Sequence, residues 1–354
     1  MSKFLNKRYR TLEVYTPGEQ PQDMVYIKLN TNESPYPAAP QVVDAIGRTE
    51  LENLRLYSDP ESKPLVRKLA EVYGVGPENV FVSNGSDDIL NFAFMAFSGE
   101  PGKAVFPDIT YGFYQVYADL YQIEAKLLPL DEAFAIDYRQ YCGQNCMVVL
   151  ANPNAQVGRA LPLWQMEQII ATNPDHVVVV DEAYVDFGAE SCVPLVEKYP
   201  NLLVVQTFSK SRSLAGARLG FAIASKELIE DLNRIKFSTN PYNVNRLTMA
   251  AGVAALEAET YYKENCQKIM EARTYTTEAL SELGFTVIPS QANFVFAAHP
   301  DCDGETIYRE LKKRGILVRH FFSPRIKNFN RITIGTMEQM RTMVSAVKQI
   351  LGGP

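Results

Sequence analysis

The sequence contains the apolar run Val177-Val178-Val179-Val180, followed directly by Asp181-Glu182-Ala183-Tyr184. Four consecutive β-branched residues favour a strand that is buried on both faces, as in a parallel sheet covered by helices. Asp181 then lies where this strand ends. Because ligands of such sheets bind beyond the carboxyl ends of the strands, the position of Asp181 indicates a functional site.

Other short apolar runs alternate with helical patterns along the chain. Runs at 80–82 and 147–150 are each followed by a helical pattern, at 87–97 and 163–171. This alternation is typical of an α/β fold, in which helices cover both faces of a mostly parallel sheet in three αβα layers. Four polar clusters follow strands and are expected at one edge of the sheet: Asn84-Gly85-Ser86-Asp87, Asn152-Pro153-Asn154, Asp181-Glu182-Ala183-Tyr184 and Ser209-Lys210.

Lys210 follows a further apolar run, at 202–205, and is surrounded by hydroxyl and small residues. Burial and a nearby cation both lower the pKa of a lysine and free its amine for Schiff-base chemistry. Arg218 offers a planar fork suited to a phosphate, and Ser209 and Ser211 offer hydroxyl groups. A lysine beside a phosphate clamp fits pyridoxal 5′-phosphate. A serine-rich loop with a solvated lysine fits this segment equally well, so other residues have to decide.

Composition and charge exclude several classes of protein. The 354 residues are 46% hydrophobic and 21% charged, as in ordinary globular proteins, and the net charge of −6 disfavours a nucleic-acid-binding surface. No apolar run approaches the roughly 20 residues of a membrane span. The five cysteines form no C-x-x-C pair and the three histidines have no metal-ligand spacing, so neither a disulfide framework nor a metal site is expected. We expect a cytoplasmic protein with no membrane or nucleic-acid partner.

The length favours one large and one small domain. The large domain is expected at 36–245. An N-terminal arm at 1–35 and a smaller α+β domain at 246–354 form the rest, with strand-like runs near 285–288, 293–296, 316–318 and 331–334.

Each candidate residue also has a plain structural interpretation. Asp181 can pair with a pyridinium nitrogen or cap a helix, and Tyr184 can bond a ring hydroxyl or pack in the core. The turn 84–87 can bind phosphate at a helix start or serve as an ordinary N-cap. Tyr111 can stack on a cofactor ring or belong to the core.

Taken together and in this order, the segments resemble the fold-type-I, pyridoxal-phosphate-dependent aminotransferases, and among them most closely the group that acts on histidinol phosphate. The resemblance runs over nearly the whole chain. It also includes Tyr15-Thr16-Pro17-Gly18, Lys28-Leu29-Asn30-Thr31-Asn32-Glu33-Ser34-Pro35, Tyr57-Ser58-Asp59-Pro60, Ala292-Asn293-Phe294 and Arg331-Ile332-Thr333-Ile334-Gly335-Thr336.

The resemblance implies a role for each matching residue. Lys210 forms the Schiff base and moves the proton, Asp181 contacts the pyridine nitrogen, and Tyr184 contacts the ring oxygen. Tyr111 stacks on the ring. The cofactor phosphate is expected to be held by Gly85, Ser86, Asp87, Ser209 and Arg218, with Tyr57 reaching across from the second subunit of a homodimer. Substrate is expected to be bound by Arg331, which grips its anionic group, with Tyr15, Asn32 and Arg319 as accessories.

One loop departs from the family pattern. Where the family has an asparagine before Pro-Thr-Gly, this chain has Ala155, within Asn152-Pro153-Asn154-Ala155-Gln156-Val157-Gly158. The expected substitute contact to the cofactor ring is Asn154, one position earlier, by a shifted turn. Loss of one hydrogen bond, about 1 kcal/mol, retunes the site without removing its chemistry.

The function implied is a ping-pong transamination from histidinol phosphate to 2-oxoglutarate in histidine biosynthesis, through the Lys210 Schiff base. An aromatic amino-acid aminotransferase and a phosphothreonine-type decarboxylase share the same lysine, aspartate and arginine. From a different class, a catalytically decayed pyridoxal-phosphate-binding protein remains an alternative, favoured only by the altered 154–158 loop.

Overall fold

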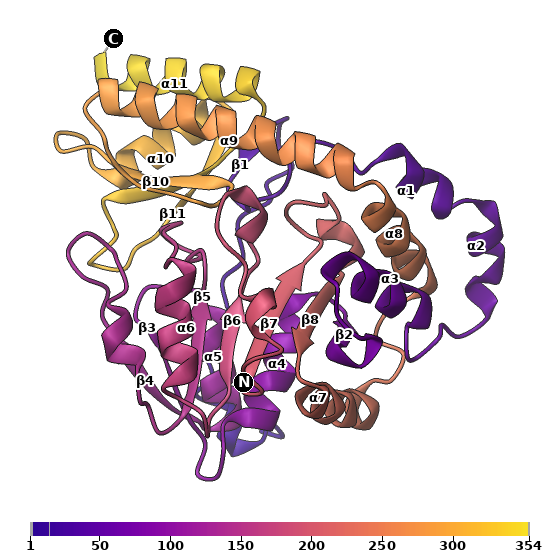
Figure 1. The fold of residues 1–354 in the computed structure, drawn as a ribbon. Coiled ribbons are helices and arrows are strands. Elements are labelled where there is room, and N and C mark those ends of the chain that lie inside the picture. The colour runs from indigo at the N-terminus through magenta and orange to yellow at the C-terminus, as the bar shows by residue number, and fades with distance from the viewer. Residues whose placement is uncertain (1–2, 14, 353–354) are drawn as a thin grey trace.

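A seven-stranded sheet forms the centre of the larger region of the molecule (Figure 1). The computed structural model describes residues 3–13 and 15–352. The strand order in this sheet is β2-β8-β7-β6-β5-β3-β4, and only β8 runs antiparallel to its neighbours. The strands are β2 (Val80–Ser83), β3 (Lys103–Pro107), β4 (Glu124–Leu128), β5 (Met147–Ala151), β6 (Val178–Asp181), β7 (Leu202–Thr207) and β8 (Gly220–Ala224).

The side chains of the sheet alternate between two cores. On β6, Val179 packs into one core, whereas Val178 and Val180 pack into the other. Such alternation follows from the two-residue period of a strand and explains why the whole run is apolar. Helices α4 (Ser86–Phe97), α5 (Phe113–Tyr121) and α7 (Lys226–Thr239) complete the first core, and helices α3 (Lys63–Tyr73), α6 (Leu163–Ala171) and α8 (Arg246–Glu257) complete the second. The two sets lie on opposite faces of the sheet (Figure 1), so the predicted three-layer α/β fold is confirmed.

The smaller region contains a five-stranded sheet with the order β1-β11-β12-β10-β9. Its strands are β1 (Ile27–Leu29), β9 (Thr286–Ile288), β10 (Phe294–Ala298), β11 (Ile316–His320) and β12 (Phe329–Thr333). Helices α9 (Glu259–Glu282) and α10 (Gly304–Lys313) pack on it. Helix α11 (Met337–Gly352) packs against both of them, and α9 and α11 lie side by side in Figure 1. β1 pairs in parallel with β11, so the N-terminal segment is part of this sheet.

Short elements complete the described chain. Two small helices, α1 (Pro40–Ala45) and α2 (Arg48–Glu52), lie beside α8, at the right of Figure 1. The domain boundary at 245/246 stays a prediction, although α8, just beyond it, packs against α1 and α3 of the larger region. Among the described residues, none of the helices has the length and apolarity needed to cross a membrane. The 3-10 helices are Lys7–Tyr9, Asn53–Arg55, Pro77–Asn79, Tyr138–Tyr141, Val185–Phe187, Val193–Leu195 and Ala215–Ala217.

Candidate active site

The predicted polar clusters meet at one edge of the large sheet. β2, β7, β6, β5 and β3 all point their carboxyl ends in the same direction, because β8 is the single reversed strand between β2 and β7. A cavity of about 150 Å³ lies at this edge. Eight of the residues predicted to bind the cofactor line it: Ser86, Asp87, Tyr111, Asp181, Tyr184, Ser209, Lys210 and Arg218.

Lys210 lies three residues beyond the end of β7. Its Nζ donates a hydrogen bond to Thr31 O at 3.2 Å and lies 5.7 Å from the centre of the Tyr184 ring. Burial, followed by the positive charge of Arg331, lowers the pKa of the Lys210 amine to about 8. The amine is therefore neutral in a large fraction of molecules at slightly alkaline pH, as nucleophilic chemistry requires.

Asp181 is the last residue of β6 and is 4% exposed. Its Oδ2 accepts a hydrogen bond from Tyr114 Oη at 2.8 Å, and its Oδ1 accepts one from Ala183 N at 3.2 Å. Burial raises the pKa of the Asp181 carboxyl to about 6, although both hydrogen bonds oppose that shift. A positively charged group placed in the cavity would favour the ionised carboxylate.

Tyr184 is held by the N-terminal segment. Its Oη accepts a hydrogen bond from Asn32 Nδ2 at 3.0 Å, which leaves the phenol proton free to point into the cavity. Asn32 is itself fixed by Thr333, whose hydroxyl donates to Asn32 Oδ1 at 2.9 Å and accepts from Asn32 N at 2.9 Å. Burial raises the pKa of the Tyr184 phenol, so Tyr184 stays a donor at neutral pH.

The first turn of α4 faces the guanidinium of Arg218. Gly85 precedes the helix with φ of 86°, a backbone conformation that favours glycine. A Cβ at Gly85 would lie 2.8 Å from Arg218 Nη2, so the absence of a side chain allows the guanidinium to approach this turn closely. Arg218 Nη2 donates to Asp87 Oδ2 at 2.8 Å. Free backbone N–H groups of a helix start beside an arginine form a site suited to a phosphate.

Tyr111 and Ser209 lie next to this anion site. Tyr111 Oη donates to Asp87 Oδ1 at 2.7 Å, so one carboxylate orients both the aromatic ring and Arg218. Ser209 Oγ accepts a hydrogen bond from Thr207 Oγ1 at 3.0 Å, which leaves the Ser209 proton available to a ligand.

A second cavity, of about 420 Å³, adjoins the first and is also lined by Lys210, Tyr184 and Tyr111. The four residues predicted to bind substrate all line it: Tyr15, Asn32, Arg319 and Arg331. Arg319 and Arg331 are paired across β11 and β12, so neighbouring strands bring two positive charges to one wall. This larger cavity has the charge expected of a site for an anionic substrate.

Arg331 has unused hydrogen-bonding capacity. Its Nη1 donates to Ala155 O at 2.8 Å, but its buried Nε has no partner among the described residues. Burial lowers the pKa of the guanidinium, which still remains charged. An unpaired buried donor is costly, and an anion in the cavity would satisfy it.

Arg319 contacts the N-terminal arm. Its two terminal nitrogens donate to Pro17 O at 3.0 Å and to Thr16 O at 2.8 Å. Next to these carbonyls, the Tyr15 ring packs against Phe113 with centroids 4.3 Å apart. Arg319 therefore fixes the segment that covers the larger cavity.

Two predicted cofactor residues lie elsewhere. Tyr57 is 82% exposed and stacks on Tyr242, with ring centroids 4.7 Å apart. Asn154 is buried, and its Nδ2 donates to Ile109 O in the segment after β3, while its Oδ1 accepts from Gln156 N and Val157 N in its own loop. Ala155, rather than Asn154, lines the cavity beside Lys210.

Sequence reasoning missed Tyr114 as a functional residue. It is fully buried on α5 and bonds Asp181, yet in the sequence it is one of several aromatic residues between 111 and 121. A tyrosine on a helix that packs against the end of β6 carries no local sign that its hydroxyl reaches a carboxylate.

The donor set fits pyridoxal 5′-phosphate. The close approach of Arg218 to the turn at Gly85 suits the phosphate, and the acidic Asp181 suits a pyridine nitrogen. The Tyr184 hydroxyl suits the ring oxygen, and the Lys210 amine suits the aldehyde. All four groups line one cavity or its rim.

Comparison with known proteins gives a consistent result. A family model described as aminotransferase class I and II matches residues 25–347. A histidinol-phosphate aminotransferase of Marinomonas sp. (strain MWYL1) is 51% identical over 353 residues, 99% of this chain and 100% of the relative. One from Brachyspira hyodysenteriae is 48% identical over 352 residues, with 99% of each chain covered.

Solved structures share the fold. Histidinol-phosphate aminotransferase from Sinorhizobium meliloti, solved in complex with pyridoxal 5′-phosphate, has a TM-score of 0.87 at 23% identity, covering 99% of this chain and 98% of that one. The enzyme of the same name from Clostridium acetobutylicum has a TM-score of 0.83 at 22% identity, covering 91% and 98%.

Proposed function

The chain belongs to the aminotransferase class I and II family, and on that premise we propose that it transfers an amino group from histidinol phosphate to 2-oxoglutarate. It is an aminotransferase that depends on pyridoxal 5′-phosphate. The observation that carries the choice of substrate is the pair Arg319 and Arg331 beside Lys210 in one cavity. Two arginines suit a phosphate monoester and, in the second half of the cycle, a dicarboxylate.

Lys210 is the proposed catalytic base and acid. When bound, the cofactor supplies an aldehyde that accepts an amine and a ring that withdraws electrons. Lys210 Nζ would remove the proton from the substrate carbon that carries the amino group. It would then return a proton to the other carbon that is bonded to the transferred nitrogen. Its pKa of about 8 suits both steps, because the amine can accept and release a proton near neutral pH.

Asp181 and Tyr184 tune the ring from its two sides. The Asp181 carboxylate would hold a proton on the ring nitrogen, and Tyr114 orients that carboxylate through its hydroxyl. Tyr184 would donate its phenol proton to the ring oxygen, because its own oxygen is already bonded by Asn32. With Ala155 in the loop, Tyr184 is the donor that this proposal relies on at that oxygen.

The phosphate would be held by Ser86, Asp87 and Gly85 at the start of α4, with Ser209 and Arg218 on the other side. The Asp87 carboxylate acts there by orienting Arg218 and Tyr111. Asn154 is not included among these ligands, since its side chain is bonded to backbone groups of Ile109 and Gln156.

Substrate would be bound under the N-terminal arm. Arg331 would pair with the anionic group through its unpartnered Nε, and Tyr15 and Arg319 would close the cavity from the arm side. Excluding water from this cavity strengthens each of these charged contacts.

A homodimer is part of the proposal. Tyr57 is too exposed to serve a site in its own subunit. The segment that precedes it in the sequence carries further exposed apolar side chains that a second copy would cover: Val43, Leu51, Leu54 and Leu56. We propose that Tyr57 reaches the phosphate in the neighbouring subunit. The five cysteines are all free thiols, which fits a reducing cytoplasm.

The test is the absorbance spectrum of the protein reconstituted with pyridoxal 5′-phosphate, before and after histidinol phosphate is added without a keto acid. We expect the cofactor band to convert to that of pyridoxamine 5′-phosphate and to return with 2-oxoglutarate. An unchanged band would reject the substrate. Faster conversion with phenylalanine would favour an aromatic aminotransferase, release of carbon dioxide a decarboxylase, and failure to form any band a decayed protein.

A further inference from the structure

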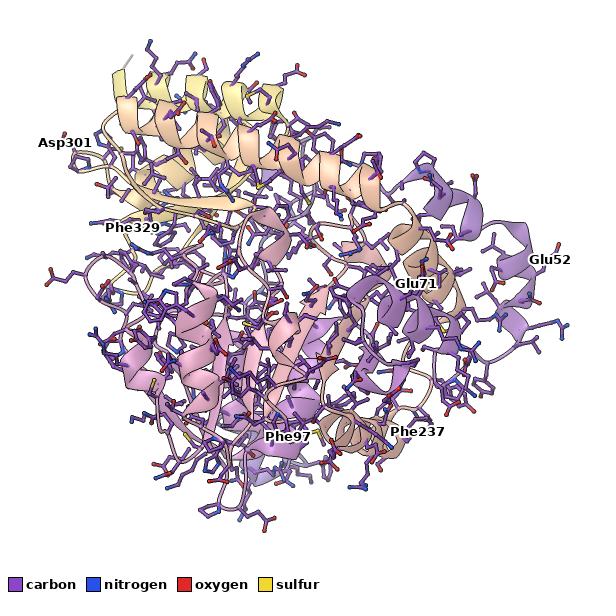
Figure 2. All side chains as sticks on the ribbon, in the orientation of Figure 1. Glu52, Glu71, Phe97, Phe237, Asp301 and Phe329 are labelled. Carbon is purple, nitrogen blue, oxygen red and sulfur yellow. The ribbon has the colours of Figure 1, made fainter. Side chains whose placement is uncertain are left out.

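Lys236 is a buried lysine on α7 that plays no part in the proposed mechanism. It is 2% exposed, whereas the next residue, Phe237, is 46% exposed and lies at the outer surface in Figure 2. The Lys236 Nζ donates hydrogen bonds to two backbone carbonyls, Pro60 O at 2.8 Å and Val82 O at 3.4 Å. It also lies 5.7 Å from the centre of the Phe81 ring.

Burying an ammonium group costs free energy unless its hydrogen bonds are satisfied, so the two carbonyls that Lys236 bonds indicate why a lysine is present at this position. Burial lowers the pKa of Lys236 to about 8, and the more distant charges of Asp59, Asp88 and Glu61 only partly oppose that shift. An apolar side chain would fill the same space without the desolvation cost, but it would leave both carbonyls without this donor. The position of Lys236 therefore depends on which chain segments these two carbonyls belong to.

Both segments lead to groups proposed to bind the cofactor phosphate. Val82 is on β2, and the turn that begins α4 with Gly85 and Ser86 follows within four residues. Pro60 lies three residues after Tyr57, the residue proposed to reach the phosphate of the neighbouring subunit. Lys236 thus connects strand β2, which leads into the phosphate site of its own subunit, to the segment that carries Tyr57. Tyr57 is the residue proposed to reach the phosphate site of the neighbouring subunit.

A second set of bonds joins the same two segments. Asn243 Nδ2 donates to Ser83 Oγ at 2.6 Å and to Asp88 Oδ2 at 2.9 Å, on the side of α4. On the other side, Ser58 Oγ donates to Val244 O at 2.7 Å. The stack of Tyr57 on Tyr242 continues this arrangement, so the chain from 236 to 244 bridges both segments.

We propose that Lys236 is a positioning residue for the cofactor phosphate, which sets the turn at Gly85–Ser86 and the Tyr57 segment relative to each other through Val82 O and Pro60 O. In the homodimer, this junction links the phosphate site of one subunit to the tyrosine that it presents to its partner. The inference rests on the proposed cofactor and on the proposed place of Tyr57, but not on the identity of the substrate.

The experiment compares equilibrium binding of pyridoxal 5′-phosphate and of pyridoxal, which lacks the phosphate, to the full-length apoprotein. The variants are Lys236→Met, Lys236→Gln and Lys236→Arg. Lys226→Met is the matched control, because Lys226 is an exposed lysine on the same helix, paired with Glu230. Thermal unfolding of each apoprotein is recorded beside the binding data.

For Lys236→Met we expect the Kd for pyridoxal 5′-phosphate to rise about tenfold or more, as for a lost hydrogen bond to a charged group. The Kd for pyridoxal should change less than about twofold, because Lys210 and Asp181 do not depend on this junction. Lys236→Arg should recover part of the difference, and Lys226→Met should bind both ligands as the unmodified protein does. If Lys236→Met does not fold, Lys236→Gln, which keeps a donor and loses the charge, is expected to show the same selective loss.

Equal weakening of both ligands, or no weakening of either, would overturn the proposal, since a merely structural lysine does not distinguish the phosphate. A double-mutant cycle with Tyr57→Phe tests the link between segments: we expect the two effects to be non-additive, and strict additivity would reject it. An unmodified protein that binds the cofactor but does not react with histidinol phosphate would lose its proposed substrate and leave this comparison intact.

Discussion

The Lys210 amine is the proposed acid–base group of transamination. It faces both cavities, and its pKa of about 8 suits both removal and return of a proton. We expect Lys210→Ala to lower the rate of transamination by at least about 10⁴-fold, the upper range for loss of a positioned acid–base group. Steady-state turnover with histidinol phosphate and 2-oxoglutarate measures it. The control is Lys198→Ala, at an exposed lysine paired with Glu167, and more than a trace of activity in Lys210→Ala would contradict the assignment.

Asp181 illustrates a conflict between function and stability at one residue. Its pKa of about 6 lies above the ordinary value near 3.8, so the folded apoprotein binds this proton more tightly than the unfolded chain does. The stability that Asp181 contributes is therefore present below about pH 4 and is lost as pH rises through 6. A shift of about 2 units corresponds to about 3 kcal/mol at pH 8.

We accordingly expect Asp181→Asn to stabilise the apoprotein by up to about 3 kcal/mol at pH 8 and to change it little at pH 4, while transamination falls sharply. The free energy of unfolding in urea at pH 4, 6 and 8 measures this. Burial raises the pKa of Glu182 to about 7, and this carboxyl is present in both proteins. Its contribution therefore cancels when the unfolding free energies of the two proteins are subtracted. A stability difference that does not vary with pH would contradict the prediction, and Asp231→Asn is the exposed control.

Residue types and their order predicted most of the residues that line the candidate cofactor cavity, but they could not predict the contacts between these residues. Asp181 and Lys210 were predictable as site residues because each follows an apolar strand-like run in the sequence. Arg218 was predictable because it lies shortly after Lys210. The Tyr114–Asp181 bond was not, because it joins residues 67 apart on different elements. The predicted reach of Asn154 to the ring depended on the turn of its loop, where three backbone groups bond its side chain instead.

At the scale of elements, the turn from β2 into α4 is the most constrained part of the site. Gly85 combines a positive φ with close approach to Arg218. Gly74, after α3, also has a positive φ, of 67°, but a Cβ added there would meet no heavy atom within 4 Å. Gly85→Ala should therefore cost about 1–3 kcal/mol of stability and also displace Arg218. Gly74→Ala should lower stability by about 1 kcal/mol through backbone strain, without displacing any neighbouring side chain.

Cofactor titration separates these two effects. We expect Gly85→Ala to raise the Kd for pyridoxal 5′-phosphate by about tenfold or more, because the phosphate loses its arginine. Gly74→Ala should leave that Kd unchanged. Equal affinities for the two variants would mean that the close approach of Gly85 to Arg218 does not serve the phosphate.

The alternation of strands and helices was predictable because the central strands β2, β5 and β6 are apolar on both faces, and amphipathic helical patterns follow β2 and β5 in the sequence. The reversal of β8 was not predictable, since Gly220–Ala224 is as apolar as the parallel strands of the same sheet. The pairing of β1 with β11 joins residues nearly 290 positions apart in sequence, and no local pattern encodes it.

At the scale of the whole molecule, the proposed site is completed by a second copy of the chain. Tyr57 projects from the segment between α2 and α3, beside exposed Leu54 and Leu56 and in a ring stack with Tyr242. A C2 dimer would place the same surface of each subunit against the other and give each site one foreign tyrosine. Covering these apolar side chains would supply part of the association energy.

Mixed dimers test this arrangement directly. A Lys210→Ala subunit lacks the amine but carries Tyr57, and a Tyr57→Ala subunit carries the amine but lacks the tyrosine. If Tyr57 acts across the interface, the Tyr57→Ala subunit of a mixed dimer has one complete site, formed by its own Lys210 and its partner's tyrosine. Random pairing makes about half of the dimers mixed, so activity should return to about a quarter of that of the unmodified protein at limiting cofactor. Each variant alone should be nearly inactive under these conditions. If Tyr57 served its own subunit instead, no mixed dimer would contain a complete site, and mixing would restore nothing.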